Sequence, residues 1–86
     1  MFELKIDKGV ERSLKKLPNE VVANLLRAMR DLVTDPLPHG CRKIVGPDRS
    51  YRIRVGDYRI VYEIDEAGRL IVIHAAGHRK DVYRDY

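Results

Sequence analysis

The segment from Ser50 to Ile64 constrains the fold more than any other, because its register can be worked out on paper. Two runs of alternating residues flank Gly56-Asp57, a glycine-first pair suited to a two-residue type II′ hairpin turn. Such a turn fixes which residues lie opposite each other. On one face the expected pairs are Tyr51 with Tyr62, Ile53 with Ile60, and Val55 with Tyr58; on the other they are Ser50 with Glu63, Arg52 with Val61, and Arg54 with Arg59.

The second face of this hairpin places arginine opposite arginine. Like charges directly opposite each other destabilise a sheet. The cross-strand pair of Arg54 and Arg59 therefore indicates that the protein holds an anion there, and we favour a phosphate group. The alternative is a solvated basic surface that protects the sheet from edge-to-edge aggregation.

The composition is typical of a single folded domain covering residues 1–86. Of these 86 residues, 44% are hydrophobic and 35% are charged, which argues against intrinsic disorder. The apolar runs are far shorter than the ~20 residues of a membrane-spanning helix, and charged residues interrupt the N-terminal segment where a signal peptide would be apolar. Cys41 is the only cysteine. We expect an inert thiol in a cytoplasmic protein without membrane association.

The positive charge of the chain is concentrated in its second half. The net charge is only +4, but between His39 and Arg59 the acids Asp48 and Asp57 are outnumbered by cations. Such clustering is expected of a surface that binds nucleic acid. The cations of this segment are Arg42, Lys43, Arg49, Arg52, Arg54 and Arg59.

Two helices are expected in the first half of the chain. After Asp7, a candidate N-cap, apolar residues recur at helical spacing, and Pro18 ends the first helix. Asn19 is a candidate N-cap for a second helix, which ends before Pro36 because the residue before a proline avoids helical backbone. The apolar positions are Val10, Leu14 and Leu17 in the first helix, and Val22, Leu25, Leu26, Met29, Leu32 and Val33 in the second.

The remaining segments predict strands around the hairpin. Alternation predicts a short strand over residues 2–6, and a second short strand is expected within residues 40–45. Residues 70–76 form a nearly continuous apolar run, typical of a strand in the middle of a sheet. We expect Gly77 to end this strand, and residues 78–86 to form a polar tail.

The predicted fold class is α+β, with the order β-α-α-β-β-β-β. Two N-terminal antiparallel helices would pack on one face of a mainly antiparallel sheet of four to five strands. That face would carry Tyr51, Ile53 and Tyr62, while the face with the arginines would be left to solvent or a ligand.

Motifs for metal or cofactor chemistry are absent from the sequence. The three histidines and Cys41 lack zinc-ligand spacing, and no glycine-rich phosphate loop or nucleophilic serine motif occurs. The arginines suit metal-free RNA cleavage, in which the ribose 2′-hydroxyl attacks the adjacent phosphate and the enzyme clamps and neutralises that phosphate. Arginine clamps phosphate well but is a poor proton shuttle.

Two histidines and one tyrosine have different expected roles. His74 lies within the apolar strand and is expected to be a buried, hydrogen-bonded histidine. His78, beside Arg79, is expected to be exposed and to titrate near neutrality. Tyr83 has no evident position in the core, so it is the better candidate for stacking on a base.

The hairpin run Tyr-Arg-Ile-Arg-Val-Gly-Asp-Tyr-Arg-Ile-Val-Tyr-Glu-Ile and the later Ala-Gly-His-Arg-Lys-Asp-Val-Tyr of residues 76–83 resemble the RelE branch of the RelE/ParE toxin superfamily. The resemblance spans essentially the whole chain. It implies a RelE-like fold and a toxin of a type II toxin–antitoxin system, which cleaves mRNA in the ribosomal A site without a metal or other cofactor and so inhibits translation.

The resemblance also assigns roles to individual residues. It implies an active site made of Arg52, Arg54 and Arg59 on the hairpin with Arg79 and Tyr83 near the C-terminus. Together with the charge pattern, we predict catalytic roles for Arg54, Arg59, His78, Arg79 and Tyr83, and RNA or phosphate binding by Arg42, Lys43, Arg52 and Lys80. Some RelE toxins carry lysines where this chain has Arg52 and Arg54. Since arginine cannot serve as a general base, there are three alternatives: another group is the base, with His78 the first candidate; the activity is weaker; or the arginines act only electrostatically.

The resemblance leaves three functions open. The first is the ribosome-dependent endoribonuclease, with the ribosome, mRNA and a cognate antitoxin as partners and a possible hetero-oligomer with that antitoxin. The second is a ParE-like toxin that inhibits DNA gyrase without cleaving RNA; Arg59, Arg79 and Tyr83 together favour the RelE reading over it. The third is a cleavage-dead relative that only binds RNA or the ribosome.

Overall fold

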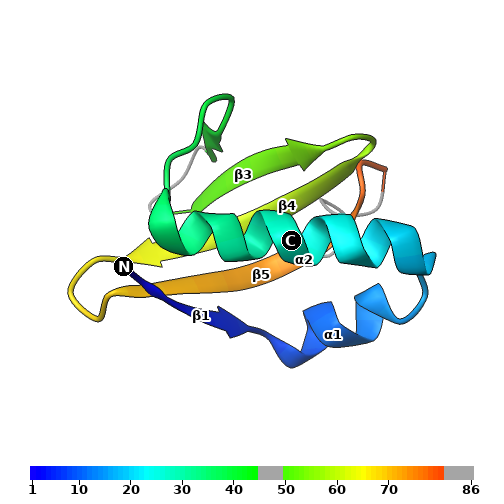
Figure 1. The fold of residues 1–86 in the computed structure, drawn as a ribbon, viewed down its shortest axis with the longest axis horizontal. Helices are drawn as coiled ribbons and strands as arrows, with labels where there is room; N and C mark the ends of the chain where they lie inside the picture. The colour runs from blue at the N-terminus through cyan, green and yellow to red at the C-terminus, as the bar shows by residue number, and fades with distance from the viewer. Residues whose placement is uncertain (45–49, 81–86) are drawn as a thin grey trace.

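The computed structural model describes residues 1–44 and 50–80 of the chain (Figure 1). In these residues, two helices and five strands follow one another in the predicted order, which confirms the α+β fold class. The elements are β1 (Glu3–Ile6), α1 (Lys8–Leu14), α2 (Asn19–Thr34), β2 (Arg42–Lys43), β3 (Ser50–Val55), β4 (Tyr58–Asp65) and β5 (Leu70–His78).

The strands form one mixed sheet in the order β1-β5-β4-β3-β2. Only β1 and β5 pair in parallel; the other neighbours are antiparallel. The apolar strand β5 therefore lies inside the sheet between β1 and β4, as its composition predicts. In Figure 1, α2 runs back in the direction opposite to α1 and crosses one face of the sheet.

The hairpin of β3 and β4 has the predicted register at all six pairs, from Ser50 opposite Glu63 to Val55 opposite Tyr58. Gly56 has a φ of 62°, a left-handed conformation that glycine adopts without the steric cost of a Cβ atom. Asp57 has a negative φ, so only the first turn residue is left-handed, as a type II′ turn requires.

The hydrophobic core lies between the helices and one face of the sheet. Its centre is Tyr62, which is 0% exposed; the Tyr62 hydroxyl donates a 2.6 Å hydrogen bond to the Pro36 carbonyl, and its ring lies 6.0 Å from that of Tyr51. The predicted packing of the hairpin tyrosines against the core is thus confirmed. Other fully buried residues are Leu25, Met29, Ile60, Ile71 and Ile73.

The helix termini differ from the sequence prediction. Asp7 is at the N-cap position of α1, but its side chain does not bond to the helix; it contacts His74 instead. Pro18, not Asn19, is the N-cap of α2. Proline is extended at this position, which leaves Asn19 as the first helical residue, so its side chain cannot act as the cap.

The strand boundaries also differ. Gly77 does not end β5, because Gly77 and His78 still pair with Arg59 and Tyr58 of β4, and these ladder bonds outweigh the weak strand propensity of glycine. The short strand expected within residues 40–45 is reduced to Arg42–Lys43. Val45 lies outside the described residues, as does most of the tail expected at 78–86.

The turn at Gly56 predicts opposite effects for two glycine substitutions. Gly56→Ala should lower the free energy of unfolding by about 1 kcal/mol or more, because alanine is strained at positive φ. Gly9→Ala, in α1 with open space around the new methyl group, should raise it by about 0.5–1 kcal/mol. Urea denaturation measures both; equal effects would contradict the assigned turn.

Tyr62→Phe should cost about 1 kcal/mol at neutral pH, because the Pro36 carbonyl loses its donor. Burial raises the pKa of the Tyr62 phenol above its ordinary value, so the folded state holds the neutral form. The stability that this provides is complete below about pH 10, where unfolded tyrosine titrates, and is lost as the pH rises further. Urea titrations at pH 7 and pH 11 should show a smaller difference between the two proteins at pH 11.

Candidate phosphate-binding site

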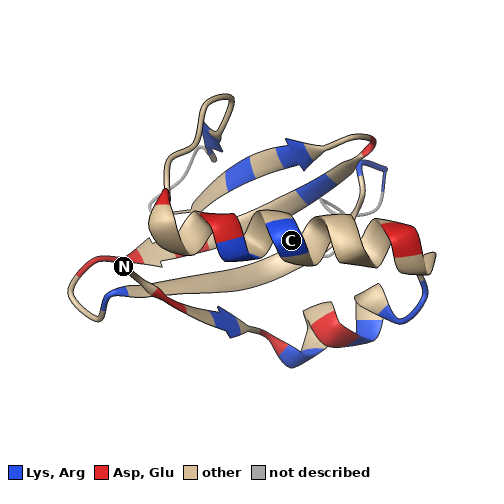
Figure 2. Ribbon diagram, viewed as in Figure 1, with Lys and Arg blue, Asp and Glu red and all other residues tan. Residues whose placement is uncertain are grey.

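The arginines of the hairpin share the face of the sheet opposite the helices. Arg54 on β3 lies directly opposite Arg59 on β4, and Figure 2 shows the basic residues along both strands. None of Arg52, Arg54 and Arg59 forms an ion pair with a carboxylate in the described parts of the chain. Among the described residues no acid compensates their mutual repulsion, and an anion would relieve it.

A second cross-strand arginine pair adjoins the first. Arg42 of β2 lies opposite Arg52 of β3, so these two guanidinium groups extend from the same face as Arg54 and Arg59. The sequence predicts Arg42 as a phosphate ligand but does not predict this pairing, because a two-residue strand gives too little pattern to fix its register. Lys43 lies opposite Tyr51 and hence belongs to the other face.

Arg59 is less accessible than the sequence predicts. The expectation that this face is open to solvent is wrong for Arg59, which is 8% exposed, and for Val61, which is 0% exposed. Nη1 of Arg59 donates to the Tyr58 carbonyl at 3.3 Å, and the β5 residue opposite Arg59 is Gly77, which has no side chain. Arg54 remains exposed. A phosphate would reach Arg54 first, with Arg59 as a partly desolvated charge behind it.

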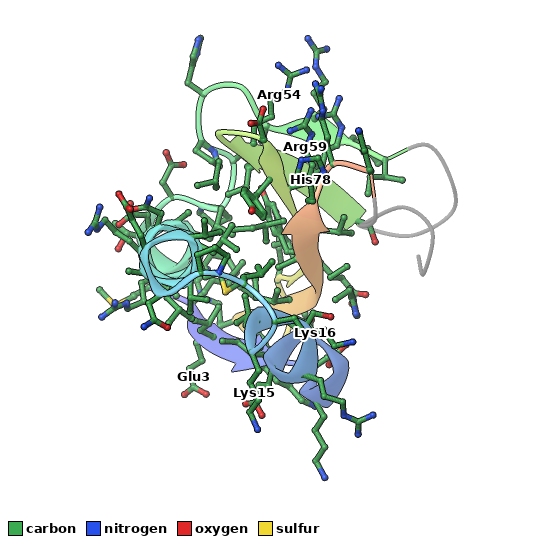
Figure 3. The ribbon with its side chains drawn as sticks, turned by 90° about the vertical axis from the view of Figure 1, so that its right-hand side faces the viewer. Glu3, Lys15, Lys16, Arg54, Arg59 and His78 are labelled. Carbon is green, nitrogen blue, oxygen red and sulfur yellow. The ribbon has the colours of Figure 1, made fainter. Side chains whose placement is uncertain are left out.

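The end of β5 lies beside the hairpin turn. His78 pairs with Tyr58, and their rings meet edge to face at a centroid distance of 5.5 Å. The Arg79 N–H donates to the Asp57 carbonyl at 3.0 Å. Arg54, Arg59 and His78 lie at the same end of the molecule in Figure 3. The structure thus brings the hairpin arginines close to His78 and Arg79, which belong to the Ala-Gly-His-Arg-Lys-Asp-Val-Tyr motif of residues 76–83.

The tautomer of His78 follows from its backbone contact. The Lys80 N–H donates to Nδ1 of His78 at 3.2 Å. Nδ1 must then be the acceptor, so a neutral ring carries its proton on Nε2. This geometry suits a hydrogen-bond donor better than the general base expected from the sequence. Tyr83 lies outside the described residues, and its role stays a prediction.

His74 is half-buried and hydrogen-bonded, as expected. Its Nδ1 lies 3.1 Å from Oδ2 of Asp7, and its Nε2 lies 3.3 Å from Oε1 of Glu63. Residue 74 is the additional residue of a bulge, since Val61 pairs with Ala75 while Tyr62 pairs with Ile73. Sequence reasoning did not find these carboxylate partners, because Asp7 and Glu63 are far from His74 in the sequence.

Neither a metal centre nor a membrane segment is found in the described residues. They contain no group of three or more histidine, cysteine or acidic side chains arranged to hold a metal ion. No helix among them has the length and apolar character needed to cross a bilayer.

Comparison with known proteins identifies the family. Residues 4–83 match the family model described as ParE toxin of the type II toxin–antitoxin system, parDE. The chain belongs to the RelE/ParE toxin superfamily. The predicted family resemblance is thereby confirmed.

Curated relatives and solved structures carry the RelE name. The chain is 32% identical to toxin RelG of Mycobacterium tuberculosis, with 96% of this chain and 97% of the relative covered. It is 29% identical to the putative toxin RelE1 of Methanocaldococcus jannaschii, with 98% and 97% covered. The archaeal RelE–RelB complex of Pyrococcus horikoshii contains a chain that superposes with a TM-score of 0.81 at 28% identity, over 94% of this chain and 98% of that one. These relatives make this chain a RelE-family toxin.

The arginine pairs predict that polyanions stabilise the fold. Pyrophosphate at about ten times its Kd should raise the free energy of unfolding by about 1.4 kcal/mol. The double variant Arg52→Gln/Arg54→Gln should lose most of this gain, and should be a few tenths of a kcal/mol more stable without the anion. Urea denaturation at matched ionic strength measures both effects. Arg30→Gln, on the exposed side of α2, is the control and should respond like the unaltered protein.

Proposed function

We propose that this RelE-family toxin is a ribosome-dependent endoribonuclease that cleaves mRNA in the A site by metal-free attack of the 2′-hydroxyl on the adjacent phosphate. The observation that carries the proposal is the set of paired arginines, which form no ion pair with a carboxylate of residues 1–44 or 50–80, beside His78 and Arg79. Guanidinium groups hold phosphate through paired planar donors. No cofactor is required, because the nucleophile belongs to the substrate.

The basic residues have different roles in the proposed reaction. Exposed Arg54, with Arg52 and Arg42, holds the backbone phosphates. Arg59 is mostly withdrawn from water, so its charge is screened less and is suited to stabilise the negative charge that grows on the phosphate oxygens. Arg79, fixed by its backbone to the turn at Asp57, adds a second positive charge. Lys80 is exposed and contributes to RNA binding.

His78 is the hydrogen-bond donor to the leaving group in this proposal. With Nδ1 accepting from the Lys80 N–H, the Nε2–H of the neutral ring donates a hydrogen bond to the 5′-oxygen. Full transfer of a proton requires the imidazolium, in which Nδ1 is also protonated and no longer accepts from Lys80. The group that accepts the 2′-hydroxyl proton is not one of the arginines, because a guanidinium does not lose its proton at physiological pH. Tyr83 is assigned to stacking on a base of the codon.

The proposal places the protein in the cytoplasm with the translating ribosome and mRNA as its substrate complex. Its further partner is a cognate antitoxin, which would form a hetero-oligomer with it. The support comes from the RelE–RelB complex of Pyrococcus horikoshii, in which a chain of the same fold is bound to RelB.

A ParE-like activity on DNA gyrase is the second candidate, and the description of the matching family model favours it. The paired arginines favour the endoribonuclease, since a protein that acts only through contact with gyrase has no need to place like charges opposite each other. A supercoiling assay with purified gyrase separates the two. Ribosome binding without new mRNA ends would instead indicate a cleavage-dead relative.

If the protein is an endoribonuclease, Arg79→Ala should lower the rate of mRNA cleavage without unfolding the protein. Removal of one group that stabilises the transition state typically lowers kcat by about 10²-fold or more, so cleavage should fall by at least that factor while the fold is retained. Primer extension on an mRNA translated in vitro measures cuts within codons. Arg30→Ala serves as the control and should cleave normally. Unchanged transcripts with the unaltered protein, together with inhibited gyrase, would overturn the proposal.

A further inference from the structure

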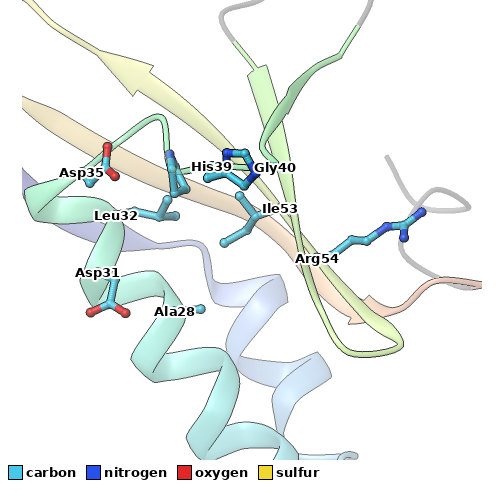
Figure 4. Close-up of a pocket in the computed structure, with 9 residues that line it drawn as sticks. Ala28, Asp31, Leu32, Asp35, His39, Gly40, Ile53 and Arg54 are labelled. Atoms are coloured by element: carbon cyan, nitrogen blue, oxygen red, sulfur yellow. The ribbon is translucent and has the colours of Figure 1, made fainter.

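A groove on the helix side of the sheet lies outside the face described above. It is a cavity of about 450 Å³ between the second half of α2, the segment before β2, and β3. Figure 4 shows its apolar floor and polar rim. The lining residues are Ala28, Leu32, Pro38 and Ile53 on the floor, with Asp31, Asp35, His39, Gly40 and Arg54 around them.

The groove exists because β2 leaves the sheet early. Arg42 lies opposite Arg52, so one further step of two residues would place Gly40 opposite Arg54. Gly40 instead has a φ of 89°, and the Cys41 N–H donates to the Pro38 carbonyl at 3.0 Å. This turn carries the chain away from the edge of β3.

The departure of β2 leaves a hydrogen-bonding position on β3. The Ile44 N–H donates to the Ser50 carbonyl at 3.0 Å, so the backbone groups of Ser50 point toward β2. Backbone groups alternate in direction along an antiparallel strand, so those of Arg52 and Arg54 point the same way. Arg52 is paired with Arg42, whereas no residue in the described parts of the chain pairs with Arg54 from that side.

Charge at the groove differs from that of the arginine face. Asp31 and Asp35 lie one turn apart at the end of α2, where the helix dipole is negative and the last turn contains no basic residue. The side chain of Arg54 points away from the groove in Figure 4. The rim is thus acidic in a protein whose net charge is positive.

We propose that this groove is a docking site for an extended polypeptide segment that pairs with the open edge of β3 at Arg54 and places a lysine or arginine side chain in the groove. A strand at this edge would exchange backbone hydrogen bonds with Arg54. The residue of the docked strand that lies opposite Arg54 would project from the same face as Arg54 and Arg59, where a carboxylate could pair with a guanidinium group. The neighbouring residue of the docked strand would point to the helix side of the sheet. A lysine or arginine at that position would pack its aliphatic stem over Leu32 and Ile53 and place its charge near Asp31 and Asp35.

Such a segment would also control the arginine face. The carboxylate opposite Arg54 would neutralise the most exposed guanidinium of the hairpin, and this consequence rests on the proposed function. Docking itself does not depend on nuclease activity, so it is tested without RNA or ribosomes.

The test uses the capped heptapeptide acetyl-Thr-Val-Lys-Glu-Lys-Val-Thr-amide and the ¹⁵N-labelled protein. Saturable shifts of the backbone amide signals of Leu32, Ile53 and Arg54 are expected. The double variant Asp31→Asn/Asp35→Asn should bind at least threefold more weakly. The same peptide with an N-methyl group on its glutamate cannot donate that backbone hydrogen bond and should bind at least tenfold more weakly.

Three results would contradict the docking proposal. Shifts confined to Arg52 and Arg59 would show that the peptide binds only by charge on the other face. Equal affinity of the N-methylated peptide would exclude strand pairing, and the absence of saturable binding at millimolar peptide would exclude the site. Any of these results overturns the docking proposal and leaves the nuclease proposal to its own assay.

Discussion

The pairing of β3 with β4 through the Gly56 turn is the constraint on which the rest of the molecule depends. A side-chain period of two means that this register decides, residue by residue, what faces the helices. Tyr62 and Ile60 are thereby directed into the core, where the Tyr62 hydroxyl reaches the carbonyl of Pro36 after α2. The same register directs Arg54 and Arg59 to the opposite side as a facing pair. Core and charged surface are therefore two results of a single alignment, and a slip of one position would destroy both.

The bulge in β5 has a comparable influence on the other side of β4. Because His74 is an additional residue, the pairing of the last part of β5 is shifted by one, which places Gly77 opposite Arg59 and His78 opposite Tyr58. Bulges commonly redirect side chains next to functional sites. Here the bulge residue is held by Asp7 before α1 and by Glu63 of β4, so three separate segments of the chain fix its position. The bulge thus places opposite the buried Arg59 a glycine with open space where a Cβ would lie.

Much of this fold could be predicted from the sequence where the signal is local. The hairpin was specified by alternation and a two-residue turn, and α2 by its apolar stripe, because backbone geometry acts over a few residues. What failed depends on contacts between distant residues. Gly77 remains in a strand because it pairs with β4, and Asp7 bonds to His74 and not to its helix. Arg59 is buried although the alternation places it on the face expected to be open. The pairing of Arg42 with Arg52 could likewise not be predicted, because so short a strand gives too little pattern to fix its register. The residue types of the site were thus predictable, whereas their exposure and hydrogen-bond roles were not.

The parallel contact between β1 and β5 joins the first strand of this chain to its last. During synthesis, Glu3–Ile6 emerges long before Leu70–His78, so the edge of the sheet stays incomplete until residues up to 78 have left the exit tunnel. Contacts of such long sequence separation form late, since the intervening chain must first be ordered. The β1 edge of the sheet is therefore expected to be completed late in folding.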